Sequence, residues 1–371
     1  MRKNILLYMP PNKRTVALET VILETAKHHN ITLLTLAGRG DLHLFLESKG
    51  IVCETMEVNE SNPILRIIKH TVKLVQYCRK NQIDTLWSHL HPCNLYAVLA
   101  QFFIPSKTII FRHHFHAQIK ETGMKGLNRN ELWMEKIISW LAKKIVVPSS
   151  EVYNGMITYE GIDSRKIEII PYIYNFDTYS LPNIEEVKKI KEAYPCQLRV
   201  LMAMRMIKLK RHLLVLPAIK RLIIEGYDIQ VLLLDDGEEK GAIMKYIQDN
   251  NLQKNIHLLG FQRNIIDYIE ACDIVLHPSS TEASSSLIKE AGYLCKTVIA
   301  CKGVGDFSDY INHFENGFLL NPGKEEKETY ELIKMILEDN VNVSEIGSQL
   351  QEAVVKKFTV SQTILDKYYS L

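Results

Sequence analysis

Residues 277–292 read HPSSTEASSSLIKEAG, a stretch of small and hydroxyl-bearing side chains that contains two glutamates, Glu282 and Glu290. A short apolar run, residues 274–276, precedes it, and a second apolar run, residues 297–301, follows it. Apolar runs of this length predict buried strands, and the segment between them predicts a loop and a helix that begins near Ser285. Strand, loop, helix and strand in this order are the repeating unit of a parallel α/β sheet.

The same alternation runs through the chain of 371 residues. In the first half the sequence predicts strands at 5–9, 31–36, 85–89, 108–112 and 145–148, and helices at 16–28, 64–79, 95–103 and 131–142. In the second half it predicts strands at 200–204, 229–234, 256–259, 274–276 and 298–301, and helices at 213–224 and 285–294. Near-continuous apolar strands separated by helices predict parallel sheets that are covered on both faces.

One passage interrupts this rhythm. Residues 174–199 contain Pro182, a charged helical pattern and Pro195, which together predict a boundary between domains. The length of the chain, with 46% hydrophobic and 24% charged residues, suits two domains with separate cores. We therefore expect a first domain at residues 1–180 and a second at residues 181–355, each with the doubly wound α/β fold.

Charge and cysteine usage exclude several classes of function. The net charge is +2, and basic and acidic residues are interleaved, so we expect no nucleic-acid partner. The seven cysteines are scattered without metal-ligand spacing, which is typical of a reduced, cytoplasmic protein. The apolar part of the N-terminal segment spans about five residues and ends at two prolines, too short for a signal peptide or a membrane span.

Residues 277–292 also predict a binding site. Open α/β sheets bind ligands beyond the carboxyl ends of their strands, and two such domains in tandem make a cleft. A helix that begins there offers unpaired N–H groups to an anion such as a phosphate, from Ser284, Ser285, Ser286 and Leu287. Glu290, about 7 Å further along the helix, would then meet a ribose, and Glu282 on the loop would face a transferred sugar. Ordinary N-capping is the alternative explanation of the serines.

A second signal follows the strand predicted at 200–204. Arg205 and Lys210 stand five residues apart where this strand gives way to the next helix. Cations at that place can hold a diphosphate, the arginine as a fork and the lysine as a point charge. The alternative interpretation is a solvated basic loop. The two glutamates in the same domain favour the diphosphate-binding interpretation over this alternative.

The ordered segments of the second half resemble the C-terminal domain of retaining GT-B glycosyltransferases of the family-four type. The segments that carry this resemblance are RVLMAMRMIKLKRH, LLLDDGE, LLGF, ACDIVLHPSSTEASSSLIKEAG, TVIACKGVGDFSDYI and ENGFLL, between about residues 199 and 322. The resemblance implies two Rossmann-like domains facing across a cleft, with Glu282 and Glu290 as the E-x7-E pair and Arg205 and Lys210 at the diphosphate. Gly305 matches the first glycine of the family's later glycine loop.

The first half is similar to the same family in looser form. IIFRHHFHAQ, residues 109–118, resembles the strand that ends in a histidine facing the transferred sugar. His113 and His114 both remain candidates for that catalytic position, with His113 favoured because Arg-His is a frequent form of the motif. The resemblance also implies that a C-terminal helix, residues 356–371, crosses back to the first domain.

The resemblance implies a hexosyltransferase that moves a sugar from a nucleotide-diphosphate donor to a saccharide or lipid-linked acceptor, with retention of configuration. We expect a role in cell-surface polysaccharide synthesis, such as that of lipopolysaccharide. We expect no metal and no other cofactor, since Arg205, Lys210 and the helix start supply the positive charge. Residues 64–80, ILRIIKHTVKLVQYCRK, form a basic amphipathic pattern, so we also expect peripheral contact with the inner membrane surface.

Two alternative functions remain open at this point. A hydrolysing sugar-nucleotide epimerase has the same two-domain shape, and a non-catalytic subunit that binds nucleotide-sugar has the same donor site. The sequence also departs from the family pattern, because Arg211, Asp235 and Ala283 stand where glycines are usual and residues 10–14 lack paired glycines. His89 and His91 lack a third ligand at metal-binding spacing, so we expect no metal there.

Overall fold

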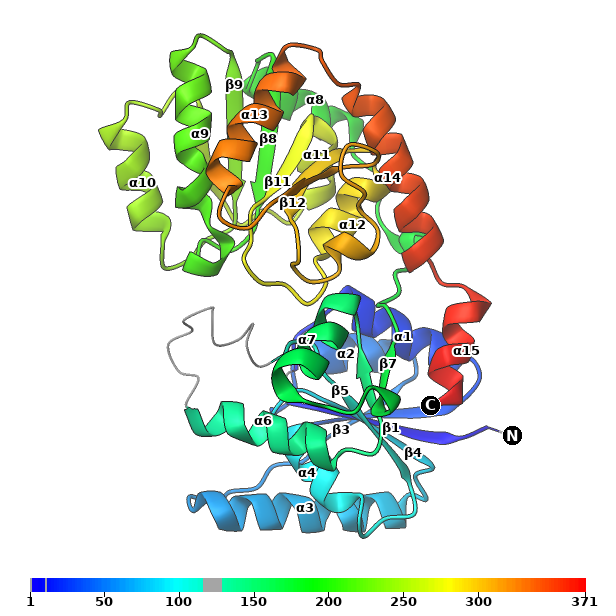
Figure 1. The fold of residues 1–371 in the computed structure, drawn as a ribbon. Helices are drawn as coiled ribbons and strands as arrows, with labels where there is room; N and C mark the ends of the chain where they lie inside the picture. The colour runs from blue at the N-terminus through cyan, green and yellow to red at the C-terminus, as the bar shows by residue number, and fades with distance from the viewer. Residues whose placement is uncertain (1, 11, 116–128) are drawn as a thin grey trace. The chain divides into compact units, whose positions relative to one another are not determined.

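The computed structural model describes residues 2–10, 12–115 and 129–371, which form two compact units. Unit 1 comprises Met1–Asn175 together with Val360–Leu371, and unit 2 comprises Phe176–Thr359 (Figure 1). The sequence placed these boundaries at residues 180 and 355, a few residues from the observed ones. The first boundary lies at the start of the segment 174–199 that interrupts the alternation of strands and helices.

Unit 1 is built on a seven-stranded parallel sheet with the strand order β3-β2-β1-β4-β5-β6-β7. Its strands are β1 (Asn4–Met9), β2 (Asn30–Thr35), β3 (Val52–Thr55), β4 (Thr85–His89), β5 (Lys107–Phe111), β6 (Ile145–Val147) and β7 (Ile167–Ile169). Its helices are α1 (Val16–Ala26), α2 (Asp41–Ser48), α3 (Pro63–Lys80), α4 (Cys93–Ala100), α6 (Arg129–Leu141), α7 (Ser150–Glu160) and α15 (Gln362–Ser370). In the central strand β1, Ile5 pairs with Ile31 of β2 on one side and with Thr85 of β4 on the other.

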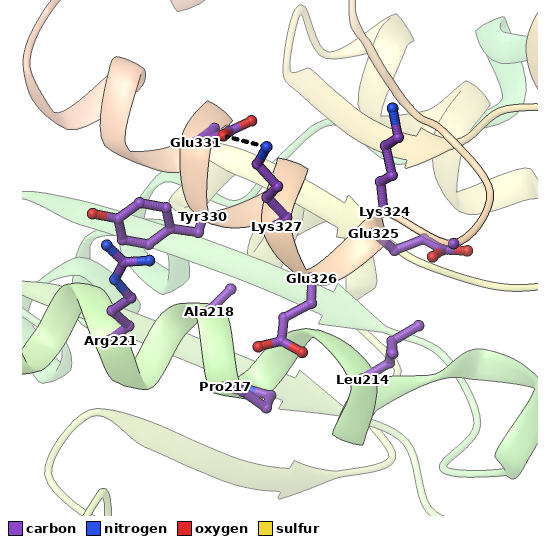
Figure 2. Close-up of a pocket in the computed structure, with 11 residues that line it drawn as sticks. Leu214, Pro217, Ala218, Arg221, Lys324, Glu325, Glu326, Lys327, Tyr330 and Glu331 are labelled. Atoms are coloured by element: carbon purple, nitrogen blue, oxygen red, sulfur yellow. Dashed lines mark ion pairs between the residues drawn. The ribbon is translucent and has the colours of Figure 1, made fainter.

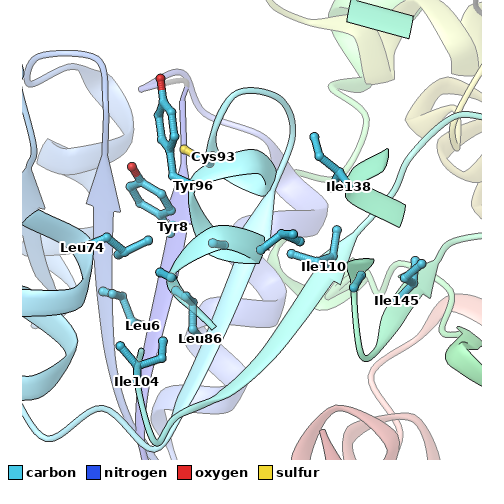
Figure 3. Packing of buried hydrophobic residues seen from close by; sticks show 14 of the residues in the cluster. Leu6, Tyr8, Leu74, Leu86, Cys93, Tyr96, Ile104, Ile110, Ile138 and Ile145 are labelled. Atoms are coloured by element: carbon cyan, nitrogen blue, oxygen red, sulfur yellow. The ribbon is translucent and has the colours of Figure 1, made fainter. Parts of the chain in front are cut away.

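The sheet of unit 1 has a separate hydrophobic core on each face. Alternate residues of a strand point to opposite faces, so Leu6 and Tyr8 of β1 enter one core and Leu7 enters the other. Helices α3, α4, α6 and α7 cover the first core, where Leu6 and Tyr8 lie beside Leu74 of α3 and Cys93 of α4 (Figure 3). Helices α1, α2 and α15 cover the second core.

Unit 2 repeats this plan with a six-stranded parallel sheet in the order β10-β9-β8-β11-β12-β13. Its strands are β8 (Leu198–Ala203), β9 (Ile229–Leu234), β10 (Ile256–Gly260), β11 (Ile274–His277), β12 (Thr297–Cys301) and β13 (Phe318–Leu320). Its helices are α8 (Ile184–Ala193), α9 (His212–Ile224), α10 (Lys240–Asp249), α11 (Ile265–Ala271), α12 (Ser286–Tyr293), α13 (Glu325–Leu337) and α14 (Val343–Phe358). The predicted fold class, two Rossmann-like domains, is therefore confirmed.

Three strands escaped the pattern analysis, namely β3, β7 and β13. They are four, three and three residues long, and each lies at an edge of its sheet. A strand of three or four residues is too short to show a clear hydrophobic period. In addition, three of the four residues of β3 are exposed, whereas all three residues of β13 are buried. Short edge strands therefore give a weak signal in a hydrophobicity pattern.

The C-terminal helix begins later than the sequence suggested. The expected helix at 356–371 is divided at residues 359–361, which separate α14 in unit 2 from α15 in unit 1. Helix α15 packs into unit 1, where the Tyr368 hydroxyl donates to the Pro171 carbonyl at 3.2 Å and its ring lies 5.9 Å from that of Trp87.

Along the described residues, no helix combines the length and the apolar character that crossing a bilayer requires.

Candidate functional site: the carboxyl edge of the unit 2 sheet

The candidate site lies where the chain changes direction across the sheet of unit 2. Strand β8 lies between β9 and β11; the chain leaves β8 through α9 to reach β9, and it later returns through α11 to β11 on the other side of β8. The loops that follow β8 and β11 therefore diverge at the carboxyl edge of the sheet, which is where doubly wound folds bind their ligands. Arg205 and Lys210 belong to the first loop, and Glu282 belongs to the second.

Glu282 is the centre of a charged cluster between these loops. The Lys210 ammonium donates to Oε1 of Glu282, and Nε2 of His277 lies 2.8 Å from the same oxygen. Burial alone would raise the pKa of Glu282, but the hydrogen bond and charge of His277, together with the charge of Lys210, hold that pKa well below its usual range. Glu282 is therefore ionised at neutral pH.

Backbone contacts fix the loop that carries Glu282. The Ser280 N–H and hydroxyl both donate to the Leu209 carbonyl, at 2.9 and 3.1 Å, so the loops after β8 and β11 are tied together. The loop after β12 closes on the same place through Gly305. A Cβ added at Gly305 would lie 3.0 Å from the Cβ of Glu282, and its φ of +55° favours glycine.

Lys289 and Asp306 form a buried ion pair that the sequence analysis missed. Lys289 Nζ lies 2.6 Å from Asp306 Oδ2, and their side chains are 0% and 1% exposed. The Ser284 hydroxyl donates to the same carboxylate at 2.7 Å, and Lys289 donates to the Ser284 oxygen at 2.7 Å. This network joins the start of α12 to the glycine loop after β12. A lone lysine in a helix usually faces solvent, so no pattern in the sequence indicates this role.

Glu290, the fifth residue of α12, lies in different surroundings from Glu282. Its side chain is buried, and its Oε1 accepts a hydrogen bond of 3.4 Å from the Tyr179 hydroxyl. The ring of Tyr179 lies 5.6 Å from that of Phe176, which stacks on Tyr293 at 4.5 Å. Burial raises the pKa of Glu290 to about 7, although the hydrogen bond from Tyr179 opposes the rise. The carboxyl of Glu290 is therefore protonated far more readily than that of Glu282.

The start of α12 keeps its amide donors available. Ser285 is the N-cap residue, but its side chain makes no capping hydrogen bond. The hydroxyl of Ser284 is committed to Asp306, and Ser286 is exposed while Leu287 is buried. The first-turn N–H groups thus lack the side-chain acceptor that usually satisfies them, which is compatible with the expected binding of an anion there.

The two predicted diphosphate-binding cations differ in their surroundings. Lys210 is paired with Glu282, whereas Arg205 is exposed and makes no ion pair with another residue of the described ranges.

Two of the positions where the resembled family has glycine keep a glycine-like backbone. Arg211 has a φ of +55° and Asp235 a φ of +82°, both in the left-handed half of the backbone map. The Arg211 guanidinium is held 2.7 Å from Glu325, which helps to fix this conformation.

In unit 1, the structure places the ring of His113 at the carboxyl edge of the sheet. His113 Nδ1 contacts the Tyr172 hydroxyl, and the ring stacks 5.6 Å from that of His89. Burial, with the charges of His114 and Arg112 nearby, lowers the pKa of His113 to about 3, so the imidazole is neutral. Residues 116–118, the end of the segment that suggested this histidine, lie outside the described residues.

Arg112 fixes the backbone beside this ring. Its guanidinium pairs with Glu160 at 3.0 Å and with Glu135 at 3.2 Å, and it donates to the His114 carbonyl at 3.0 Å. The Arg112 side chain is 4% exposed, so this arrangement is internal.

Among the residues that the structure describes, His89 and His91 included, no group of three His, Cys, Asp or Glu side chains could hold a metal ion.

A separate pocket of about 520 Å³ lies between α9 and α13 (Figure 2). Arg221 stacks over the ring of Tyr330 at 3.8 Å, and Lys327 pairs with Glu331 at 3.6 Å along its wall. The lining residues do not include Glu282, Glu290, Arg205 or Lys210. This pocket is therefore distinct from the cluster at the carboxyl edge of the sheet.

Comparisons with known proteins place both halves of the chain in one group of families. Residues 183–354 match the family model for glycosyl transferases group 1, and residues 16–176 match the model for glycosyltransferase family 4. The N-acetylgalactosamine-N,N'-diacetylbacillosaminyl-diphospho-undecaprenol 4-alpha-N-acetylgalactosaminyltransferase of Campylobacter jejuni is 24% identical over 315 residues, covering 81% of this chain and 83% of its own length.

Two further relatives extend this likeness. The poly(ribitol-phosphate) alpha-N-acetylglucosaminyltransferase of Staphylococcus aureus is 20% identical over 256 residues, which cover 69% of this chain and about half (51%) of that longer protein. Among solved structures, Anabaena HepE in complex with UDP superposes with a TM-score of 0.82 at 20% identity, covering 100% of both chains. At this identity the structural likeness establishes the fold.

Proposed function

We propose that this chain transfers a hexosyl residue from a nucleotide-diphosphate donor to a saccharide or lipid-linked acceptor. It is a glycosyltransferase by both of its matches, to the group 1 model over residues 183–354 and to the family 4 model over residues 16–176. The names of its relatives support this acceptor class. One relative acts on a diphospho-undecaprenol-linked saccharide, and another acts on poly(ribitol-phosphate). The setting we propose is cell-surface polysaccharide synthesis, which includes lipopolysaccharide.

The observation that carries the proposal is the cluster of Glu282, Lys210 and His277 beside the open start of α12. A nucleoside diphosphate leaving group needs fixed positive charge and N–H donors where its negative charge develops. Lys210, Arg205 and the first amides of α12 supply that charge and those donors. Glu282, ionised in this cluster, is suited to accept from hydroxyls of the transferred sugar as charge develops at the anomeric carbon, and Glu290 from the ribose.

We further propose that the transfer proceeds with retention and without a metal ion. In this reaction the bond between the anomeric carbon and the phosphate oxygen breaks, and the acceptor oxygen bonds to the anomeric carbon on the same face. The leaving phosphate takes the proton from the acceptor hydroxyl, so no separate base is required. Positive side chains and helix amides fill the electrostatic role that a divalent cation would otherwise have.

The test is turnover with a panel of labelled nucleotide sugars and both acceptor classes. Transfer of label to the acceptor supports the proposal, and the anomeric coupling constant of the product reports the configuration. Release of free epimerised sugar indicates an epimerase instead, and donor binding without turnover indicates a non-catalytic subunit. Inhibition by EDTA that Mn²⁺ or Mg²⁺ reverses would contradict the metal-free mechanism.

A further inference from the structure

An apolar stripe runs along the solvent-facing side of α3. Leu65, Ile68 and Val72 stand three and four residues apart, so they share one face of the helix, and they are 47%, 51% and 47% exposed. Ile64, next to the stripe, is 69% exposed. The opposite side of α3 is buried in the core of unit 1 through residues such as Leu74. The stripe is thus additional to the apolar face that the fold requires.

A row of basic residues lies beside this stripe. Arg66, Lys69, Lys73 and Lys80 are exposed, at spacings of three, four and seven residues that place them along one flank of the helix. The helix, PILRIIKHTVKLVQYCRK, contains no Asp or Glu. The contacts of this row lie in the preceding loop, where Lys69 pairs with Glu60 at 2.5 Å and Lys73 donates to the Glu57 carbonyl at 2.9 Å. Arg66 and Lys80 make no ion pair within the described residues.

The neighbouring helices on the same face of the sheet extend the exposed apolar surface. Helix α3 packs against α4, and α4 packs against α6, as Figure 1 shows for the lower part of unit 1. Phe102 and Phe103, just after α4, are 59% and 60% exposed, and Arg79 of α3 donates to the Phe103 carbonyl at 3.1 Å. Trp133 and Trp140 of α6 are 66% and 68% exposed and stand seven residues apart, on one side of that helix.

We propose that this α3–α4–α6 surface docks unit 1 on an anionic lipid surface. A helix with an apolar stripe and a flanking row of Lys and Arg lies in the interface of a bilayer, where the apolar side chains enter the headgroup boundary and the cations meet lipid phosphates. Trp residues favour the same depth. The exclusively basic charge on α3 selects an anionic membrane over a neutral one. The inference rests on the proposed function through the lipid-linked acceptor, which resides in such a membrane.

The direct test is co-sedimentation of the whole chain with vesicles, which requires no substrate. Vesicles of phosphatidylglycerol and phosphatidylcholine should bind the protein, pure phosphatidylcholine vesicles should bind it weakly, and 0.5 M NaCl, chosen to be about three times physiological, should reduce the binding. Ile68→Glu and the double variant Arg66→Glu/Lys80→Glu should each weaken binding by about tenfold or more. Leu44→Glu on α2 is the matched control, because Leu44 is 64% exposed on the opposite face of the sheet; it should bind like the wild type.

Each outcome decides the proposal. Failure of the wild type to bind anionic vesicles, or equal losses in Ile68→Glu and Leu44→Glu, would overturn it. Thermal unfolding of each variant separates lost docking from lost folding. Turnover then distinguishes docking from catalysis: Ile68→Glu should keep wild-type rates on a short water-soluble acceptor and lose rate on an acceptor embedded in vesicles. Vesicle binding by a wild type that transfers no sugar would refute the proposed function and leave the docking surface standing.

Discussion

At the residue scale, Glu282 and Glu290 are carboxylates of one short segment whose surroundings shift their pKa values in opposite directions. Glu282 meets a lysine and a histidine, whereas Glu290 is buried and accepts a hydrogen bond from one tyrosine hydroxyl. The surroundings of Glu282 therefore favour its anionic form, whereas the burial of Glu290 favours its protonated form. Ribose hydroxyls that donate to Glu290 would favour its charged form, so we expect donor binding to lower its pKa.

The raised pKa of Glu290 predicts how a neutral substitute affects stability. The folded pKa of about 7 exceeds the ordinary value of 4.5, so the stabilising protonation is complete below pH 4.5 and is lost as the pH rises through 7. At pH 8 the folded protein carries a poorly solvated carboxylate that Glu290→Gln removes. We expect the variant to melt above the wild type at pH 8 and close to it at pH 5. The exposed Glu326→Gln is the control; a pH-independent difference in Tm for Glu290→Gln would argue against the shift.

The two glutamates should also separate in kinetics. Glu290→Gln should mainly weaken donor binding, which appears as a raised donor KM. The expected loss of binding free energy is about 1–3 kcal/mol, as for a charged hydrogen bond lost in a closed site. Glu282→Gln should lower kcat more than it changes the donor KM, because its interaction with the sugar strengthens as charge develops. Steady-state rates on both purified variants test this difference. Wild-type turnover in both would refute the assignment of this segment to the donor site.

Arg205 gives a prediction about ligand selectivity. If its exposed guanidinium binds the diphosphate as proposed, Arg205→Ala should weaken binding of a nucleoside diphosphate by about tenfold, as expected for loss of a charge-assisted hydrogen bond, and leave the nucleoside nearly unaffected. Lys210→Ala should behave in the same way while also freeing Glu282. Isothermal titration with both ligands measures the effect. Equal weakening for nucleoside and diphosphate would count against a role at the phosphates.

At the element scale, the glycine loop after β12 positions the loop after β11. Gly305 and Gly303 both have positive φ, at +55° and +70°, so alanine strains the backbone at either position. A Cβ at Gly305 presses on Glu282, whereas one at Gly303 meets nothing within 4 Å. We expect similar losses of Tm from Gly305→Ala and Gly303→Ala and a much larger loss of kcat from Gly305→Ala. Matching losses of kcat would show that backbone strain alone is responsible.

The sequence predicted those parts of the fold whose signal is local. The strands at 85–89 and 229–234 appear with those bounds, because continuous buried runs are flanked by clear helical patterns. It missed features that depend on contacts distant in sequence. The pairing of Lys210 with Glu282 joins residues 72 positions apart, and Lys289 of α12 meets Asp306 only after that helix packs against the loop after β12. Neither residue type nor spacing indicates that a charged side chain will be buried against a partner from another loop.

At the scale of the whole molecule, the chain contributes to unit 1 twice. Tyr368 of α15 is 3% exposed and packs on Trp87, so the second core of unit 1 includes residues from the far end of the sequence. We expect Tyr368→Ala to destabilise unit 1 by about 3–5 kcal/mol, the cost of truncating a large buried aromatic. Hydrogen exchange measured separately for peptides of each unit should show faster opening in unit 1 and unchanged protection in unit 2. Equal loosening of both units would contradict independent cores.

From this double contribution we expect a particular order of folding during synthesis. Domains usually fold in the order in which they are synthesised. Here the sheet of unit 1 is made first, but the part of its covering layer formed by α15 arrives only after all of unit 2 has been translated. Unit 2 has its whole sequence once Thr359 has emerged, whereas the nascent unit 1 must wait with apolar side chains uncovered for residues 360–371. We therefore expect the domain that begins first to be the last to close, with its uncovered face accessible to a chaperone during synthesis.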